Sequence, residues 1–253
     1  MKPIGQPCVA GIVFAVAVEA DAFERHAERH TETRAAGLVI HEGFVAGRRI
    51  AWSVGGVGAA AAARATQLLV AGHRPGIIIS AGFAGGLDPA LQRGALVRPA
   101  RVVAEDASRL LPLVVPPLHD PAAAPPTTIV TTAAIVVSPA EKRALAARSG
   151  AHLVDMETLA VAAVAAEAGL PCAAIRVISD TADEALPPEV VTLARPQSML
   201  RLLGGTIGAV GRRPGAALDL WRLYERAIID GRTLARALAA VCGGIDEART
   251  APS

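Results

Sequence analysis

The chain has 253 residues, of which 52% are apolar and only 3% aromatic, so small aliphatic side chains must fill a large core. This length favours one α/β domain with a helical appendage over two independent domains. A net charge of +2 without an RNA- or DNA-binding motif excludes a nucleic-acid-binding class, and the absence of a run of about 18 apolar residues argues against a membrane-spanning helix.

The first predicted element is a buried strand. Residues 8–18 form an almost continuous apolar run with β-branched side chains, typical of a central strand covered on both faces. Glu19 and Asp21 close the run and no small-residue cleavage pattern follows, so we interpret it as a strand of a cytoplasmic protein and not as a signal peptide. The three cysteines lie far apart without metal-ligand spacing and are expected to be reduced core thiols.

Glycine-rich turns separate the next elements. In chain order we expect a hairpin at 44–54, a turn at 55–58, a helix at 59–71, a strand at 76–80, a glycine turn at 81–86 and a strand at 95–103. The sequence GGVG at 55–58 could be taken for a phosphate-binding loop. It lacks the full G-x-G-x-x-G pattern and an acid about 20 residues later, so a strand-to-helix turn is favoured.

The second half of the chain carries the chemistry-bearing residues. A proline-rich loop at 112–126 and an extended segment at 127–137 are followed by a helix start at Ser138, with proline at the first helical position and glutamate three residues after the capping serine. Asp155 and Glu157 stand where a strand gives way to an alanine-rich helix. The chain then returns through a buried strand that ends on Asp180, and carboxylates at strand ends are typical of ligand crevices in α/β sheets.

Two of these segments resemble one family. The sequences VDME (154–157) and RVISD (176–180) are similar to segments of nucleoside phosphorylases and methylthioadenosine/S-adenosylhomocysteine nucleosidases, where they hold the ribose and the purine. The resemblance covers residues 8–185 and implies a three-layer α/β sandwich with a mixed central sheet. Residues 186–245 would then be a helical extension packed on the domain, on an oligomer partner or on a membrane surface. The resemblance also implies a homodimer or larger, no metal and no cofactor.

Cleavage of a nucleoside requires an acid for the leaving base, a hold on the sugar hydroxyls and a nucleophile on the opposite face. The resemblance implies that Asp180, following Ser179, serves the purine N7, and that Glu157 clamps the ribose with Met156 packed on the sugar or base. Without the resemblance, Asp180 would be interpreted as a turn cap and Glu157 as a first-turn acid that stabilises its helix. Asp155 is expected to be structural.

The nucleophile side depends on Glu19. Residues 11–23, aligned without gaps, resemble the opening of the nucleosidases, and the catalytic glutamate falls on Glu19. The acids usual just before it are replaced by Ala17 and Val18, so Asp21 stays an alternative base.

The glycine turn at 81–86 resembles the purine-contacting turn of the family, so Phe83, Ala84 and Gly85 are expected to bind substrate, as is Ile135. Ser80 stands where phosphorylases have a phosphate-binding arginine, and Phe83 replaces their serine. We therefore expect water as nucleophile and hydrolysis, with phosphate as co-substrate in the alternative, phosphorolysis.

The C-terminal part suggests a branch of the family. Between Arg195 and Arg236 eight arginines face three acids, and Trp221 and Tyr224 fall on one face of a predicted amphipathic helix. The segment between the glycine turn and Val154 is short for the family. Together with the SPAEK segment (138–142) and this tail, it resembles the hopanoid-associated phosphorylases. That resemblance implies release of adenine from adenosylhopane and peripheral contact with the inner face of the membrane. Alternatives are a methylthioadenosine/S-adenosylhomocysteine nucleosidase and a non-catalytic nucleoside-binding protein.

Overall fold

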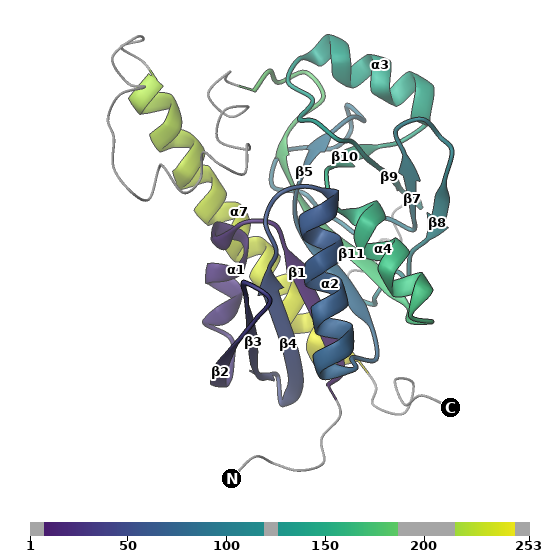
Figure 1. Cartoon of the computed structure of the whole chain (residues 1–253). Coiled ribbons are helices and arrows are strands. Elements are labelled where there is room, and N and C mark those ends of the chain that lie inside the picture. The colour runs from purple at the N-terminus through teal and green to yellow at the C-terminus, as the bar shows by residue number, and fades with distance from the viewer. Residues whose placement is uncertain (1–7, 119–125, 187–215, 246–253) are drawn as a thin grey trace.

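A computed structural model describes residues 8–118, 126–186 and 216–245, with the side chains of the last segment described from Glu225 onward (Figure 1). The strands are β1 (Ala10–Phe14), β2 (Glu28–Ala35), β3 (Leu38–Val45), β4 (Arg48–Val54), β5 (Ile78–Gly86), β6 (Leu96–Val97), β7 (Arg101–Ala104), β8 (Leu110–Pro112), β9 (Thr128–Thr131), β10 (Leu153–Asp155) and β11 (Cys172–Asp180). The helices are α1 (Ala17–Glu24), α2 (Ala59–His73), α3 (Pro139–Ser149), α4 (Thr158–Glu167) and α7 (Ala216–Gly244).

The described strands form one mixed sheet in the order β2-β3-β4-β1-β5-β10-β9-β7-β8, with β11 beside β5 and β6. β1 pairs in parallel with β4 and β5, and β5 pairs in parallel with β11. Because the carboxyl ends of β1, β5 and β11 therefore meet at one edge, the residues that follow β1 and those that end β11 lie at the same edge of the sheet.

β10 runs in the opposite direction to β5, with Val154 beside Gly85, whereas β11 runs parallel to β5. The carboxyl ends of the two strands that flank α4 therefore point in opposite directions. The short β10 instead directs its carboxyl end back along β5, toward the end of β1.

Two layers of helices cover the sheet, as expected for a three-layer sandwich. On one face Phe23 of α1 and Leu238 of α7 pack on alternate residues of β1 and β11, in a core that includes Ile12 and Ile175. On the other face α2 and α4 pack together, and Figure 1 shows both in front of the sheet. The successive side chains of each strand thus point alternately into two separate cores.

The predicted start of α3 is confirmed. The Ser138 side chain accepts a hydrogen bond from the Glu141 amide, and the Glu141 carboxylate accepts one from the Ser138 amide at 2.9 Å. The strand expected at 8–18 is shorter, because β1 ends at Phe14 and α1 begins at Ala17, so Glu19 belongs to a helix. The strand expected at 95–103 is divided between β6 and β7, and the extended segment after 127 is a strand only as far as Thr131.

The glycine turn predicted at 81–86 is wrong, because β5 continues through these residues to Gly86. Their small side chains serve close packing. A Cβ atom on Gly82 would lie 2.5 Å from Glu19 Oε1, and one on Gly85 would lie 3.1 Å from Asp180 Oδ2. The glycines therefore let two carboxylates approach the backbone of β5.

α7 continues through Gly231 without a break. A Cβ atom there would lie 2.8 Å from the carbonyl oxygen of Val18, so the glycine allows α7 to approach α1 closely. Trp221 and Tyr224, which carry the predicted amphipathic face, lie before the residues whose side chains are described. Among the described residues no helix combines the length and hydropathy needed to cross a membrane.

Candidate active site

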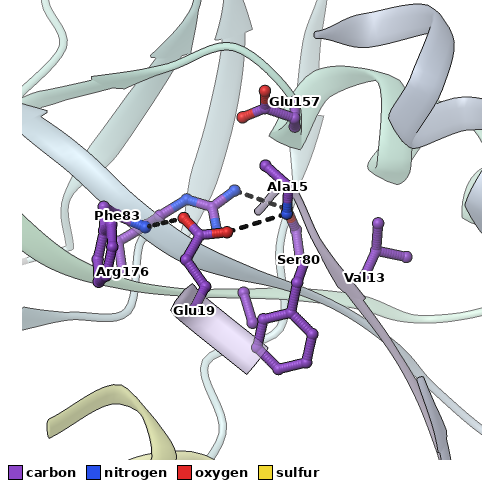
Figure 2. Close-up of a pocket in the computed structure, with 9 residues that line it drawn as sticks. Val13, Ala15, Glu19, Ser80, Phe83, Glu157 and Arg176 are labelled. Atoms are coloured by element: carbon purple, nitrogen blue, oxygen red, sulfur yellow. Dashed lines mark hydrogen bonds between the residues drawn. The ribbon is translucent and has the colours of Figure 1, made fainter. Parts of the chain in front are cut away.

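Glu19 lies in the first turn of α1 and is only 4% exposed. Its Oε2 accepts a hydrogen bond from the Ala15 amide (2.9 Å) and its Oε1 accepts one from the Phe83 amide at 2.9 Å (Figure 2). Oε2 also accepts a hydrogen bond from the Val16 amide at 3.1 Å. Burial raises the pKa of Glu19, although these hydrogen bonds partly offset the rise. The carboxylate is thus fixed between the end of β1 and the middle of β5.

Glu157 lies between β10 and α4, and its Oε1 accepts a hydrogen bond of 2.7 Å from the Gly58 amide. Burial and then the negative charge of Asp155 raise the pKa of Glu157 to about 7. The GGVG segment is a strand-to-helix turn, as expected. The Gly58 amide of this segment binds Glu157 and so contributes to the site, a contact that the sequence did not predict.

Glu19 and Glu157 face one pocket, and Phe83 also lines it (Figure 2). The pocket thus brings together three site residues that were predicted from the sequence. Its lining consists of Val13, Phe14, Ala15, Glu19, Ser80, Ala81, Phe83, Glu157 and Arg176. The pocket thus opens between the end of β1, the first half of β5 and the turn before α4.

Arg176 was missed as a site residue. Its guanidinium Nη2 donates to Asp155 Oδ2 (2.6 Å), Ser80 Oγ (2.7 Å) and Thr158 Oγ1 (2.7 Å), while its Nε is buried without a hydrogen-bond partner in the described structure. Asp155 has the structural role that was expected, because its carboxylate forms the ion pair that holds the Arg176 guanidinium in place. An arginine within the apolar run of β11 is the sequence signal that could have identified the site, since buried charges are kept only with partners.

Asp180 ends β11 and does not line this pocket. Its Oδ1 accepts a hydrogen bond of 2.6 Å from Ser179 Oγ, and its Oδ2 forms an ion pair of 2.5 Å with Lys142 Nζ. The carboxylate lies next to Gly85, two residues beyond Phe83 on β5. The predicted acid is therefore at the same sheet edge, but further along β5 than the two glutamates.

The other predicted residues lie around these acids and outside the pocket lining. The Ala84 carbonyl accepts a hydrogen bond from Ser179 Oγ, and the Met156 amide donates to Glu157 Oε2 at 3.3 Å. Ile135 is half-buried in the segment after β9. The alternative base Asp21 is exposed on α1.

One group of possible metal ligands occurs in the described structure, outside this site. Ligand atoms of His30, Glu32 and His41 lie within 4.8 Å of one another on β2 and β3. His30 Nε2 and His41 Nδ1 are 2.8 Å apart, a distance typical of a hydrogen bond between two imidazoles.

Curated relatives match part of the chain. A 5′-methylthioadenosine/S-adenosylhomocysteine nucleosidase of Haemophilus influenzae (strain 86-028NP) is 39% identical over 87 residues, which cover 34% of this chain and 38% of that protein. The protein of the same name from Actinobacillus succinogenes is 33% identical over 97 residues, covering 38% and 42%. The chain thus spans about two fifths of the length of these relatives.

Solved structures match over nearly the whole length. An S-adenosylhomocysteine nucleosidase from Streptococcus pyogenes, in complex with 5-methylthiotubericidin, has a TM-score of 0.71 at 18% identity, covering 96% of this chain and 99% of that one. The futalosine hydrolase of Helicobacter pylori strain 26695 has a TM-score of 0.65 at 19% identity, covering 92% and 97%. These similarities show a shared fold.

The match to a protein family covers more of this chain than the matches to the curated relatives do. Residues 9–127 and 122–202 match the phosphorylase superfamily, so the match extends over both halves of the sheet. It includes the segments that carry Glu19, Glu157 and Asp180. The chain therefore belongs to the phosphorylase superfamily.

Proposed function

We propose that the chain is a nucleosidase that hydrolyses the N-glycosidic bond of a 5′-substituted adenine nucleoside and releases adenine. The observation that carries this proposal is the pocket in which buried Glu19 and half-buried Glu157 lie beside Arg176. Buried acids whose pKa values are raised are suited to proton transfer and to binding hydroxyl groups near neutral pH.

Glu19 is proposed as the base that activates water. Oε2 accepts from the amides of Ala15 and Val16, whereas Oε1 accepts only from the Phe83 amide and keeps a second lone pair for a water molecule. Burial makes the carboxylate more basic than an exposed glutamate. As the water oxygen bonds to C1′, its proton passes to Glu19.

Glu157 is proposed as the ribose clamp. A carboxylate can accept hydrogen bonds from two vicinal hydroxyls, and those bonds favour its ionised form against burial and the charge of Asp155. The Gly58 amide holds one oxygen in place. Met156, adjacent in sequence, would contact the sugar or the base.

Asp180 is proposed as the acid at the purine. The base would lie beside β5 near Phe83, within reach of the Asp180 carboxylate that approaches Gly85. When the C1′–N9 bond breaks, its electron pair goes to the purine, and N7 takes a proton from Asp180 with Ser179 alongside. Ala84 would contact the purine face, and Ile135 would lie further out.

Water is favoured over phosphate by the charges around the pocket. Glu19 and Glu157 both face it, and among the described lining residues Arg176 is the one cation, with Nη2 already donating to three acceptors. A phosphate dianion would therefore meet two carboxylates and a single guanidinium that Asp155 already pairs with.

The identity of the 5′ group rests on resemblance. Similarity to the hopanoid-associated branch supports adenosylhopane, whereas the names of the curated relatives support methylthioadenosine or S-adenosylhomocysteine. The same resemblance supports a homodimer or larger and peripheral membrane contact by the C-terminal helices.

The test is chromatographic detection of adenine and of the sugar product. The full chain is incubated with adenosylhopane or methylthioadenosine, each with and without phosphate. We expect adenine and free sugar without phosphate, loss of both in Glu19→Gln, and full activity in the matched control Asp21→Asn, whose side chain is exposed on the same helix. Tight binding without adenine release would instead support a binding protein.

A further inference from the structure

A second charged side chain, Lys142, lies directly behind Asp180. Arginine supplies almost all of the 25 basic residues of the chain, and the two lysines are Lys2 and Lys142. Lys142 belongs to α3 and is 0% exposed, whereas its neighbour Arg143 is exposed. Because a buried lysine is rare without a partner, its surroundings indicate its role.

The ammonium group of Lys142 has three acceptors, one for each of its protons. Nζ lies 2.5 Å from Asp180 Oδ2, 2.6 Å from the Thr181 carbonyl oxygen and 2.8 Å from the Glu184 carbonyl oxygen. All three acceptors belong to the end of β11 and the turn after it. The ammonium group is therefore fixed on Oδ2 of Asp180. Oδ1, which accepts a hydrogen bond from Ser179 Oγ, is the oxygen that can contact a substrate.

We propose that Lys142 is a positioning residue that allows Asp180 to act as an acid inside the protein, an inference that rests on the proposed nucleosidase function. Asp180, a carboxylate in its ion pair with Lys142, takes up a proton from solvent on Oδ1 when the substrate binds. During cleavage the C1′–N9 electron pair moves to the purine, the proton on Asp180 Oδ1 moves to N7, and water adds to C1′ while its proton moves to Glu19.

This step leaves a carboxylate at a position that is only 4% exposed. An unpaired carboxylate there would be costly, and the ammonium on Oδ2 offsets that cost as the negative charge develops. Arginine, with its planar guanidinium, does not match three acceptors gathered around one point, which accounts for lysine in a chain that otherwise uses arginine.

The test compares two leaving groups on one protein sample. One substrate is methylthioadenosine, whose adenine needs a proton, and the other is the 4-nitrophenyl riboside with the same 5′ group, which leaves as a stable anion. We expect Lys142→Met to slow adenine release by about 100-fold or more but nitrophenolate release by less than about threefold. The control Arg143→Met should leave both rates unchanged. The ratio of the two rates does not depend on the folded fraction, so a destabilised variant still gives an answer.

A double-mutant cycle provides the second measurement. If Lys142 acts through Asp180, Asp180→Asn with Lys142→Met should release adenine no more slowly than Asp180→Asn alone. Equal loss on both leaving groups, or rate losses that multiply in the double variant, would overturn the inference while leaving the nucleosidase function in place. No adenine release by the unaltered chain would overturn the proposed function, and the inference with it.

Discussion

Glu157→Gln should change how the stability of the protein depends on pH. The Glu157 carboxyl has its pKa raised from 4.5 to about 7 in the folded protein by burial and by the charge of Asp155. Between these values the folded state binds a proton that the unfolded state has lost, so the stability that Glu157 contributes is present below pH 4.5 and is lost as pH rises through about 7. Glutamine keeps the oxygen that accepts from Gly58 but cannot ionise.

The size of the effect follows from the two pKa values. With RT of about 0.6 kcal/mol, the unaltered chain should lose about 2 kcal/mol of unfolding free energy through this group between pH 5.5 and pH 8. The variant should be spared that loss. Urea unfolding followed by circular dichroism at both pH values measures it, with Glu167→Gln, exposed at the end of α4, as the matched control. The same stability difference between Glu157→Gln and the unaltered chain at both pH values would refute the reasoning.

Three other substitutions test the packing of the site. Gly82→Ala should abolish most adenine release and cost about 1–3 kcal/mol, because the added Cβ would lie 2.5 Å from Glu19 Oε1. Gly72→Ala, where nothing lies within 4 Å, should instead stabilise α2 by about 0.5–1 kcal/mol. Urea unfolding should show midpoints that shift in opposite directions for the two glycine variants. Arg176→Met should lower the free energy of unfolding by about 3–5 kcal/mol, because it leaves the Asp155 charge buried and unpaired. An unfolding midpoint close to that of the unaltered chain would contradict the role given to this ion pair.

Local sequence rules predicted what depends on neighbouring residues. The capping box at Ser138 was identifiable because its two partners are three residues apart. Glu157 could be proposed from the sequence because the contiguous VDME segment resembles a family motif. The continuation of β5 through its glycines was not predicted, because glycine signals a turn unless a side chain from elsewhere fills the space beside it. Here that side chain is Glu19, on another element.

The rest of the site depends on contacts distant in sequence. The Gly58 amide that holds Glu157 is 99 residues away from it, and Lys142 is 38 residues from Asp180. The antiparallel direction of β10 is likewise set by its pairing with β5. One long-range contact was indicated by the sequence. Arg176 is a charged residue inside the apolar strand β11, and a buried charge requires a partner such as Asp155.

The most direct test of the central claim, that buried Glu19 activates water for attack on C1′, is a single-turnover reaction in H₂¹⁸O with phosphate present, followed by mass spectrometry of the sugar. We expect free adenine and a free 5′-substituted ribose that carries ¹⁸O at C1 as soon as it forms, and no such product with Glu19→Gln. Unlabelled ribosyl 1-phosphate, or unchanged labelled ribose from Glu19→Gln, would contradict it.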